Sequence, residues 1–176
     1  MTHLWKHTFA VGASDTIERK SIAPGTPVRL RLINTDDWVR QRFVLSGVPF
    51  QVSAIDGTEL HQPGTLENTA LELTTGGRYD VTFTMPSTPV FLGIGTNSSI
   101  GILMSPDGQG DIPALNSETF ALFDPAAYGG RAPTPFDASS AFDREFTMVL
   151  DNELGFYNGR FEQLYTINGK VFPNTP

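Results

Sequence analysis

The sequence contains no cysteine and only three histidines among its 176 residues. Without a thiol the chain forms no disulfide and offers no thiolate as a nucleophile or metal ligand. The histidines are His3, His7 and His61, so no His-x-His pair occurs. Chemistry that depends on cysteine is therefore excluded from this chain, and the redox compartment is left open.

Other absences narrow the possible functions. No apolar run reaches the ~20 residues of a membrane-spanning helix, and no signal-peptide segment opens the chain. Twelve Lys and Arg against nineteen Asp and Glu give a net charge of −7, without a basic cluster. Because nucleic-acid affinity rests on cationic contacts with phosphate, we expect no nucleic-acid partner. Gly93-Ile94-Gly95 lacks the third glycine of a dinucleotide motif.

What the chain does contain is typical of β-structure. It has 13 Phe, 17 Gly and 13 Pro, a composition that favours strands joined by tight turns. Short segments of alternating apolar and polar residues recur with turn signals between them, which predicts an all-β Greek-key sandwich. The expected strands are residues 5–11, 16–22, 28–34, 42–45, 50–55, 69–73, 78–85, 90–94 and 100–105.

The clearest of these strands is residues 28–34, which follows the Pro24-Gly25 turn. Residues two apart on a strand share a face. Arg29 and Arg31 are therefore expected on one side, and the apolar residues that alternate with them on the other. This pattern is that of a strand with one face in the core and one in water.

The pattern changes after residue 106. Residues 116–127 predict a short helical turn, and residues 129–142 are rich in Pro, Ala and Ser, as linkers are. Strand pattern returns in residues 145–150 and 165–167, with Asn158-Gly159 as a hairpin turn between them. We therefore predict one domain over residues 1–125, followed by a linker and a hairpin-like tail over residues 126–176.

Four phrases resemble, in order, those of laccase-like multicopper oxidases. Residues 24–34 (PGTPVRLRLIN) resemble the phrase that opens a domain of these enzymes. Residues 43–57 (FVLSGVPFQVSAIDG) and 71–81 (LELTTGGRYDV) are similar to two later phrases of the same domain, and residues 165–173 (YTINGKVFP) to the opening of the third domain. The resemblance implies a cupredoxin-like middle domain followed by the start of a third domain that the sequence does not complete.

The resemblance also bears on cofactors and partners. In this family the first and last domains hold the copper ligands, and the middle domain binds none. A type 1 copper site needs a cysteine thiolate and two imidazoles, which this chain cannot supply. The resemblance thus implies no cofactor here and copper in the parent enzyme, which would oxidise organic or metal substrates and reduce dioxygen to water.

By the same resemblance, the partners are the flanking cupredoxin domains of the same protein, and the location is extracytoplasmic. This chain alone is expected to be inactive. Two alternatives stay open. One is a domain of a copper-free relative that serves as a cell-envelope scaffold, and the other is an independent immunoglobulin-like binding module.

The histidines and one acidic pair were weighed as sites. His3 and His7 are four residues apart, which on a strand separates them by about 13 Å, so a metal role is disfavoured. His61 is expected to be an exposed loop residue. Asp36 and Asp37 could act as an acid–base pair, but adjacent aspartates after a strand are more typical of a solvated turn.

One position carries an expectation about substrate. In fungal laccase relatives, the segment that matches residues 43–47 holds an acidic residue that touches the phenol. Ser46 stands at that place here, and a serine hydroxyl cannot accept a phenolic proton as a carboxylate does. The resemblance therefore argues against classical phenol chemistry and is compatible with a different substrate. Ser46 and Gly47, at a domain boundary, are the candidate substrate-side contacts.

The remaining motif residues are predicted to be structural. Arginine and tyrosine beside glycine turns in such sandwiches tie down loops through hydrogen bonds. This predicted set is Arg29, Arg31, Asn34, Asp56, Gly57, Arg78, Tyr79 and Asp80.

Overall fold

The computed structural model describes residues 17–36, 38–95, 100–137 and 139–175. The chain divides into two compact units, Met1–Pro133 and Thr134–Pro176, and each is described by itself. No helix in the described ranges is long and apolar enough to cross a membrane. The strand predicted for residues 5–11, together with His3 and His7, lies outside the described residues.

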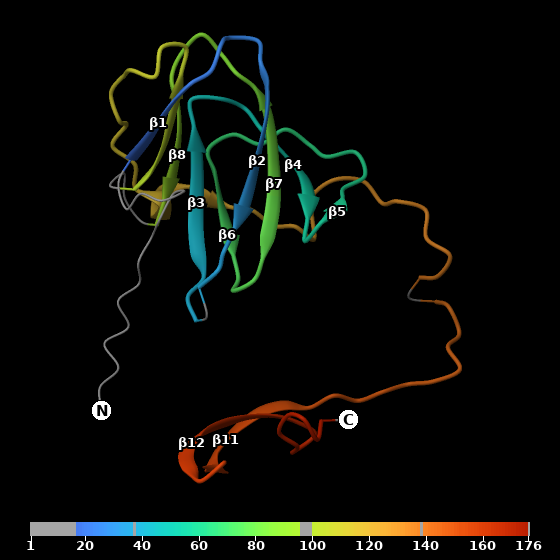
Figure 1. The fold of residues 1–176 in the computed structure, drawn as a ribbon. Helices are drawn as coiled ribbons and strands as arrows, with labels where there is room; N and C mark the ends of the chain where they lie inside the picture. Colours follow the sequence, from blue (N-terminus) through green and yellow to red (C-terminus); the bar gives the residue numbers. More distant parts are fainter. Residues whose placement is uncertain (1–16, 37, 96–99, 138, 176) are drawn as a thin grey trace. The chain divides into compact units, whose positions relative to one another are not determined.

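The first unit is a sandwich of two β-sheets (Figure 1). The larger sheet has six strands in the order β1-β9-β8-β3-β6-β10, and the smaller has four in the order β2-β7-β4-β5. The strands are β1 (Ile17–Ser21), β2 (Pro27–Ile33), β3 (Gln41–Ser46), β4 (Gln51–Ile55), β5 (Thr58–Glu59), β6 (Thr69–Leu73), β7 (Arg78–Thr84), β8 (Val90–Ile94), β9 (Gly101–Ser105) and β10 (Ala121–Leu122). The predicted all-β sandwich is confirmed.

The register of β2 and β7 confirms the predicted faces of the arginine strand. β2 pairs with β7 antiparallel, and Arg29 and Arg31 are exposed while Leu32 is buried. Antiparallel pairing dominates both sheets, and β1 with β9 and β10 with β6 are the parallel pairs. Up to β8 the chain passes repeatedly from one sheet to the other, so the two sheets fold together as one body.

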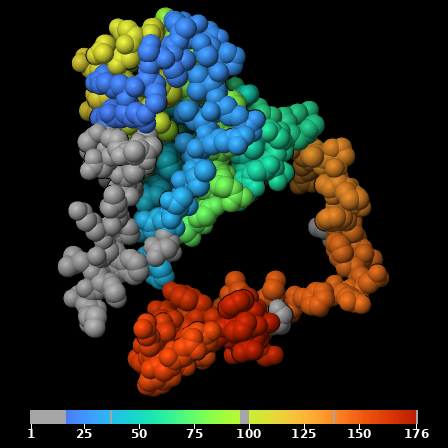
Figure 2. All heavy atoms as spheres, viewed as in Figure 1, coloured from blue at the N-terminus to red at the C-terminus, as the bar shows by residue number. Residues whose placement is uncertain are grey.

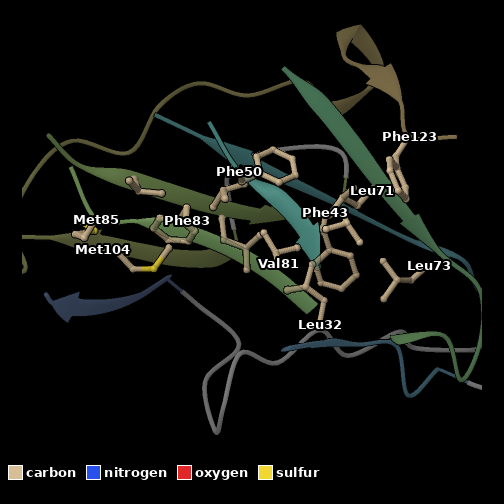
Figure 3. Packing of buried hydrophobic residues seen from close by; sticks show 14 residues of the cluster. Leu32, Phe43, Phe50, Leu71, Leu73, Val81, Phe83, Met85, Met104 and Phe123 are labelled. Atoms are coloured by element: carbon tan, nitrogen blue, oxygen red, sulfur yellow. The ribbon is translucent and has the colours of Figure 1, made fainter. Parts of the chain in front are cut away.

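The main core fills the space between the two sheets (Figure 3). Leu32 and Val81 enter it from the four-stranded sheet, and Phe43 and Leu71 enter from the six-stranded sheet. Figure 3 shows Phe43 beside Leu32, and Met85 beside Met104 at the opposite end. Burying one such side chain stabilises the fold by about 1.5–3 kcal/mol, so this cluster holds the two sheets together.

The outer face of the six-stranded sheet is buried as well. Val44, Ala70, Phe91 and Leu103 are each at most 1% exposed, although they point away from the main core. The chain returns over this face through Leu115 and the 3-10 turn η1 (Ser117–Thr119), which contacts β3. The predicted helical turn in residues 116–127 is therefore confirmed as this short turn.

Two glycines make room for an aromatic ring on this outer face. Gly93 and Gly101 lie opposite each other in β8 and β9. A Cβ at Gly101 would lie 2.7 Å from Cζ of Phe91, and a Cβ at Gly93 would lie 3.2 Å from Cε1 of the same ring. Gly93, weighed above as part of a dinucleotide motif, thus has a packing role.

Tyr128, which the sequence analysis placed in the linker, packs against the sandwich. The Tyr128 ring packs edge-on against Phe123, with centroids 4.9 Å apart. Its hydroxyl accepts a hydrogen bond from Val52 N at 3.1 Å and donates one to Gly64 O. After Tyr128, nearly every described residue from 131 to 149 is exposed. Figure 2 shows this stretch, in orange, as an extended segment one chain thick.

The second unit is a hairpin of β11 (Leu150–Tyr157) and β12 (Arg160–Ile167). The Asn158-Gly159 turn confirms the hairpin prediction, with φ of 50° and 77°. The strand bounds were wrong: residues 145–149 form no strand, and β12 begins five residues before the predicted start at residue 165. A two-residue turn lets both strands pair from the turn outward, which extends them beyond their most apolar residues.

Candidate functional site

Most of the predicted structural residues lie on the outer face of the four-stranded sheet or at its turns. Arg31 and Asp80 face each other directly across β2 and β7. Arg29 Nε donates to Asp80 Oδ2 at 2.7 Å, and its Nη2 donates to Glu59 Oε1 at 2.7 Å. Arg31 Nε lies 3.6 Å from the same Asp80 oxygen. The network joins β2, β7 and β5 across the sheet.

The electrostatics of this network follow from its geometry. The hydrogen bonds from Arg29 to Glu59 and then to Asp80 raise the pKa of Arg29 above its usual value. Arg29 therefore stays a cation under all ordinary conditions. Ion pairs at an exposed surface contribute little stability, so the network sets strand register rather than a large share of the folding free energy.

Arg78 and Asp56 tie two turns together. Asp56 and Gly57 form the two-residue turn between β4 and β5, with φ of 50° and 88°. The Arg78 backbone N donates to Asp56 Oδ1 at 2.9 Å, and its guanidinium donates to Asp56 O at 3.0 Å and to Gly76 O at 2.9 Å. These contacts fix loops and leave no donor set aimed at a ligand.

Asn34 is a buried polar residue that bridges the two sheets. It is 3% exposed at the end of β2. Its Nδ2 donates to Leu73 O at 3.1 Å, at the end of β6 in the other sheet, and to Val39 O at 2.8 Å. Its Oδ1 accepts from Asp36 N at 3.1 Å. Both ends of the amide are thus satisfied, as a buried polar group requires.

Tyr79 packs at the edge of the core. Its ring meets Phe123 edge-on, with centroids 5.6 Å apart. Burial, followed by the nearby negative charges of Asp56 and Glu72, raises the pKa of Tyr79 above its usual value. Its phenol therefore stays protonated at neutral pH, which suits a packing role.

The predicted substrate-side residues open onto a small cavity. Ser46 and Gly47 line a space of about 220 Å³ at the end of β3. Gly47 has φ of 90°, and a Cβ there would lie 2.5 Å from Pro89 O, so only glycine fits. The Ser46 hydroxyl donates a long hydrogen bond of 3.4 Å to Phe91 O.

Sequence reasoning missed two residues of this cavity. Glu67 and Asn68 line it from the segment that leads into β6, some twenty residues after Ser46. An acidic residue, Glu67, therefore lines the same cavity as Ser46. The left-handed φ of 47° at Asn68 turns the chain there, and only a turn residue before an apolar strand hinted at it.

The remaining candidates adopt structural roles. His61 is exposed in a bend after β5, as predicted. Asp36 Oδ1 accepts hydrogen bonds from the backbone N of Trp38 and Val39, each at 2.8 Å, which is the turn that the sequence favoured. Asp37 lies outside the described residues.

The sequence cannot supply a type 1 copper centre. Copper of the type 1 class requires a cysteine thiolate, and the sequence has no cysteine. Within the part of the chain that the structure describes, no three His, Asp or Glu side chains gather in a metal-binding group. No chemical step through copper is therefore derived for this chain.

Comparisons with known proteins give matches among solved structures. No family model matches the chain, and no curated protein matches it. Fet3p, described as a multicopper oxidase that functions in iron import, matches with a TM-score of 0.55 and 16% identity over 85% of this chain and 30% of its own.

Two further solved structures are similar. The laccase of Botrytis aclada has a TM-score of 0.52 and 18% identity over 86% of this chain and 29% of its own. McoA, a multicopper oxidase of the hyperthermophile Aquifex aeolicus, has a TM-score of 0.50 and 14% identity, covering 86% and 32%.

At these identities the likeness establishes the fold. The chain has a cupredoxin-like β-sandwich, the fold that the matched multicopper oxidases contain, so the fold class expected from the sequence is confirmed. It spans about a third of the length of the enzymes it matches.

Proposed function

We propose that this chain is the middle, copper-free domain of a laccase-like multicopper oxidase, with the opening of the third domain attached. The parent oxidises an organic or metal substrate and reduces dioxygen to water, outside the cytoplasm. The flanking cupredoxin domains of the same protein are the partners. This domain acts as the framework on which they assemble.

The observation that carries this proposal is the agreement between the fold and the order of the sequence phrases. The fold likeness covers 85–86% of this chain but only 29–32% of each enzyme, which fits one domain and part of another. The first three phrases fall on β2, β3, β4, β6 and β7, which belong to both sheets of the sandwich. The fourth falls on the end of β12, after the linker.

A framework role suits the chemistry of the described residues. The polar residues singled out from the sequence bond to one another or to the backbone, as Asn34 and Arg78 do. Such a network rigidifies a surface without supplying an acid, a base or a metal ligand. A rigid domain is what neighbours need if they are to hold a copper cluster at their boundary.

The cavity beside Ser46 is the proposed point of contact with the substrate. Ser46, Gly47 and Glu67 line it together. The Glu67 carboxylate can accept a proton or pair with a cation, which Ser46 cannot. Ser46→Ala in the whole oxidase should raise KM for the substrate, and unchanged kinetics would remove this contact from the proposal.

The experiment that tests the framework role is a copper measurement. The purified chain is incubated with one equivalent of Cu(II), desalted and analysed for metal and visible absorption. We expect neither stoichiometric copper nor the charge-transfer band of a copper thiolate. A His61→Ala variant controls for adventitious binding at the exposed imidazole. Tight stoichiometric copper that survives this substitution would refute the proposal.

A second observation separates an oxidase parent from a copper-free scaffold. The gene that encodes this chain should encode a His-Pro-x-His-x-His phrase and later a His-Cys-His phrase. Their presence supports the oxidase. A third cupredoxin domain without these histidines would mean a scaffold that kept the fold and lost the ligands.

A further inference from the structure

The loop of residues 60–68, which joins β5 to β6, forms part of the wall of two cavities. Glu67 lines the cavity of about 220 Å³ that Ser46 opens onto. Thr65 lines a larger cavity of about 620 Å³, which is also lined by residues of β2, β4 and β7. The segment Val48-Pro49 lines both, so the two cavities are neighbours. The position of this loop therefore shapes both cavities.

Packing alone does not hold the loop, because no residue from 60 to 68 is fully buried. Backbone hydrogen bonds fix it at two points. Leu60 N donates to Ser53 O at 2.8 Å, and Leu66 exchanges hydrogen bonds of 2.8 and 3.0 Å with Phe50. The residues between these two points need anchors of their own.

The Tyr128 hydroxyl supplies such an anchor. It donates to Gly64 O and accepts from Val52 N at 3.1 Å, so it ties the middle of the loop to β4. Gly64 directly precedes Thr65, and Val52 directly follows Gln51. Because Thr65 and Gln51 both line the larger cavity, this one oxygen sets the spacing between two of the segments that line it.

The two glycines after Tyr128 lie against the same loop. Gly130 N donates to His61 O at 2.7 Å, and Figure 1 shows the chain, in orange, leaving the sandwich near β5. A Cβ at Gly129 would lie 3.1 Å from His61 O, and a Cβ at Gly130 would lie 2.6 Å from Gln62 Oε1. Glycine at both positions allows this close approach. Together with Tyr128, the glycines hold the loop at the point where the chain leaves the sandwich.

A comparison with Tyr79 shows what the Tyr128 hydroxyl adds. Both rings meet Phe123 edge-on, with centroids 5.6 Å apart for Tyr79 and 4.9 Å apart for Tyr128. Burial, the largest cause in each case, raises the pKa of both phenols above the usual value, so both stay protonated at neutral pH. Among the described residues the Tyr79 hydroxyl has no hydrogen-bond partner, whereas that of Tyr128 has two. The Tyr128 hydroxyl therefore fixes the loop in a way that packing of the ring does not.

We propose that Tyr128 is a positioning residue for the cavity of Ser46 and Glu67, through its hold on the loop of residues 60–68. Tyr128 is not one of the described residues that line this cavity, so it acts on the cavity only through the loop. Its hydroxyl fixes Gly64, shortly before Glu67, and losing it lets the wall of the cavity move while the sandwich stays folded. The inference rests on the proposed function, in which this cavity contacts the substrate.

Amide NMR and hydrogen exchange on the 176-residue chain test the hold on the loop. Tyr128→Phe keeps the ring and removes the hydroxyl, so the Val52 N–H loses its acceptor and should exchange with solvent roughly tenfold faster. Amide resonances of residues 60–68 should shift, while those of β8 and β9 stay fixed and report a folded sandwich. Tyr79→Phe removes a hydroxyl without a partner and should leave the loop unchanged. An unmoved loop in Tyr128→Phe, or equal movement in both variants, overturns the inference.

Gly129→Ala disturbs the same loop by a second route, which covers the case in which Tyr128→Phe fails to fold. Gly129 has φ of 79°, and a Cβ there would press on His61 O, while the Tyr128 hydroxyl is kept. The amide resonances of residues 60–68 should shift in this variant too. If they do not, the segment does not hold the loop and the inference is wrong.

Kinetics of the whole oxidase test the consequence for the substrate. Tyr128→Phe should raise KM roughly three- to tenfold and leave kcat unchanged, because a displaced wall weakens binding of the ground state and the transition state alike. Tyr79→Phe should change neither constant. Unchanged kinetics in Tyr128→Phe, or a fall in kcat at unchanged KM, overturns the inference. A whole protein without oxidase activity would instead refute the proposed function, and the NMR comparison would still decide whether Tyr128 holds the loop.

Discussion

The sandwich and the hairpin are both built of alternating strands, but they bury them differently. In the sandwich, β3 has four buried residues of six and β8 has four of five. In the hairpin, β11 has none of eight and β12 has only Thr166. The sandwich holds its shape through its own core, whereas the hairpin buries almost none of its side chains by itself. A substitution in the first unit should therefore lower the stability of the sandwich, and a substitution in the second unit should leave that stability unchanged.

The largest difference should come from removing one phenylalanine in each unit. Phe50→Ala should lower the free energy of unfolding of the sandwich by about 3–5 kcal/mol, because Phe50 is 1% exposed in the main core. Phe156→Ala should change it by less than about 0.5 kcal/mol. Urea unfolding followed by circular dichroism measures both. Similar losses in the two variants would mean that the units do not unfold independently.

The next effect should come from the amide that bridges the sheets. Asn34→Ala leaves the carbonyls of Leu73 and Val39 without this donor, one of them deeply buried, and should cost about 2 kcal/mol. Asn152→Ala is the matched change on the hairpin, and its effect on sandwich unfolding should be close to zero. The contrast fails if Asn34→Ala unfolds at the same urea concentration as the original chain.

A smaller effect is expected from two glycines in similar turns. Gly57 and Gly159 have φ of 88° and 77°, and a Cβ at either would meet no atom within 4 Å. Replacement by alanine therefore adds backbone strain alone, about 1–2 kcal/mol at such a φ. Gly57→Ala should lower the melting temperature of the sandwich, and Gly159→Ala should not. If Gly159→Ala also lowered the melting temperature of the sandwich, the hairpin turn and the sandwich would be coupled in unfolding.

The smallest effect should appear in the pH dependence of the free energy of unfolding, at acid pH. Hydrogen bonds from Gln109 N and then from the Ser105 hydroxyl lower the pKa of Asp107, in the sandwich, below its usual value. Hydrogen bonds from Ser139 lower the pKa of Asp137 in the second unit. A depressed pKa adds stability above the unfolded value, which is lost as pH falls through the folded pKa.

Asp107→Asn should therefore reduce the loss of sandwich stability between neutral and strongly acid pH, measured by urea unfolding at several pH values. Asp137→Asn should leave that dependence as it is. If the two variants shift the acid dependence equally, the separation of the units is wrong.

Strand pattern alone was sufficient to predict the longer strands of the sandwich. The alternation in residues 28–34 and 78–85 predicted β2 and β7 because one face of each meets a core and the other meets water. The chain outside the core was harder to predict. β5 and β10 are two residues long, too short for any alternation, and their pairing with β4 and β6 defines them.

The hairpin strands and the residues that line the cavity could not be fully predicted from the sequence, for two different reasons. β11 contains Asp151, Asn152 and Gly155, which are poor strand formers, so its pattern is weak until the turn fixes the pairing. Glu67 reaches the cavity of Ser46 through the turn before β6, and no spacing in the sequence brings the two together. Such contacts depend on how distant loops meet.

The position of Asn34 has a consequence for how the sandwich opens. Its side chain ties β2 to the end of β6, and its backbone exchanges hydrogen bonds with Gly76 and Gly77. Hydrogen bonds of Asn34 therefore join the two sheets at this end of the sandwich. Partial unfolding should begin at the opposite end. Amide protons near Asn34 should exchange with solvent only when the whole sandwich unfolds. Amide protons at the opposite end should exchange through smaller and faster local openings. The sandwich should therefore open at the end far from Asn34, while the end that contains Asn34 stays closed.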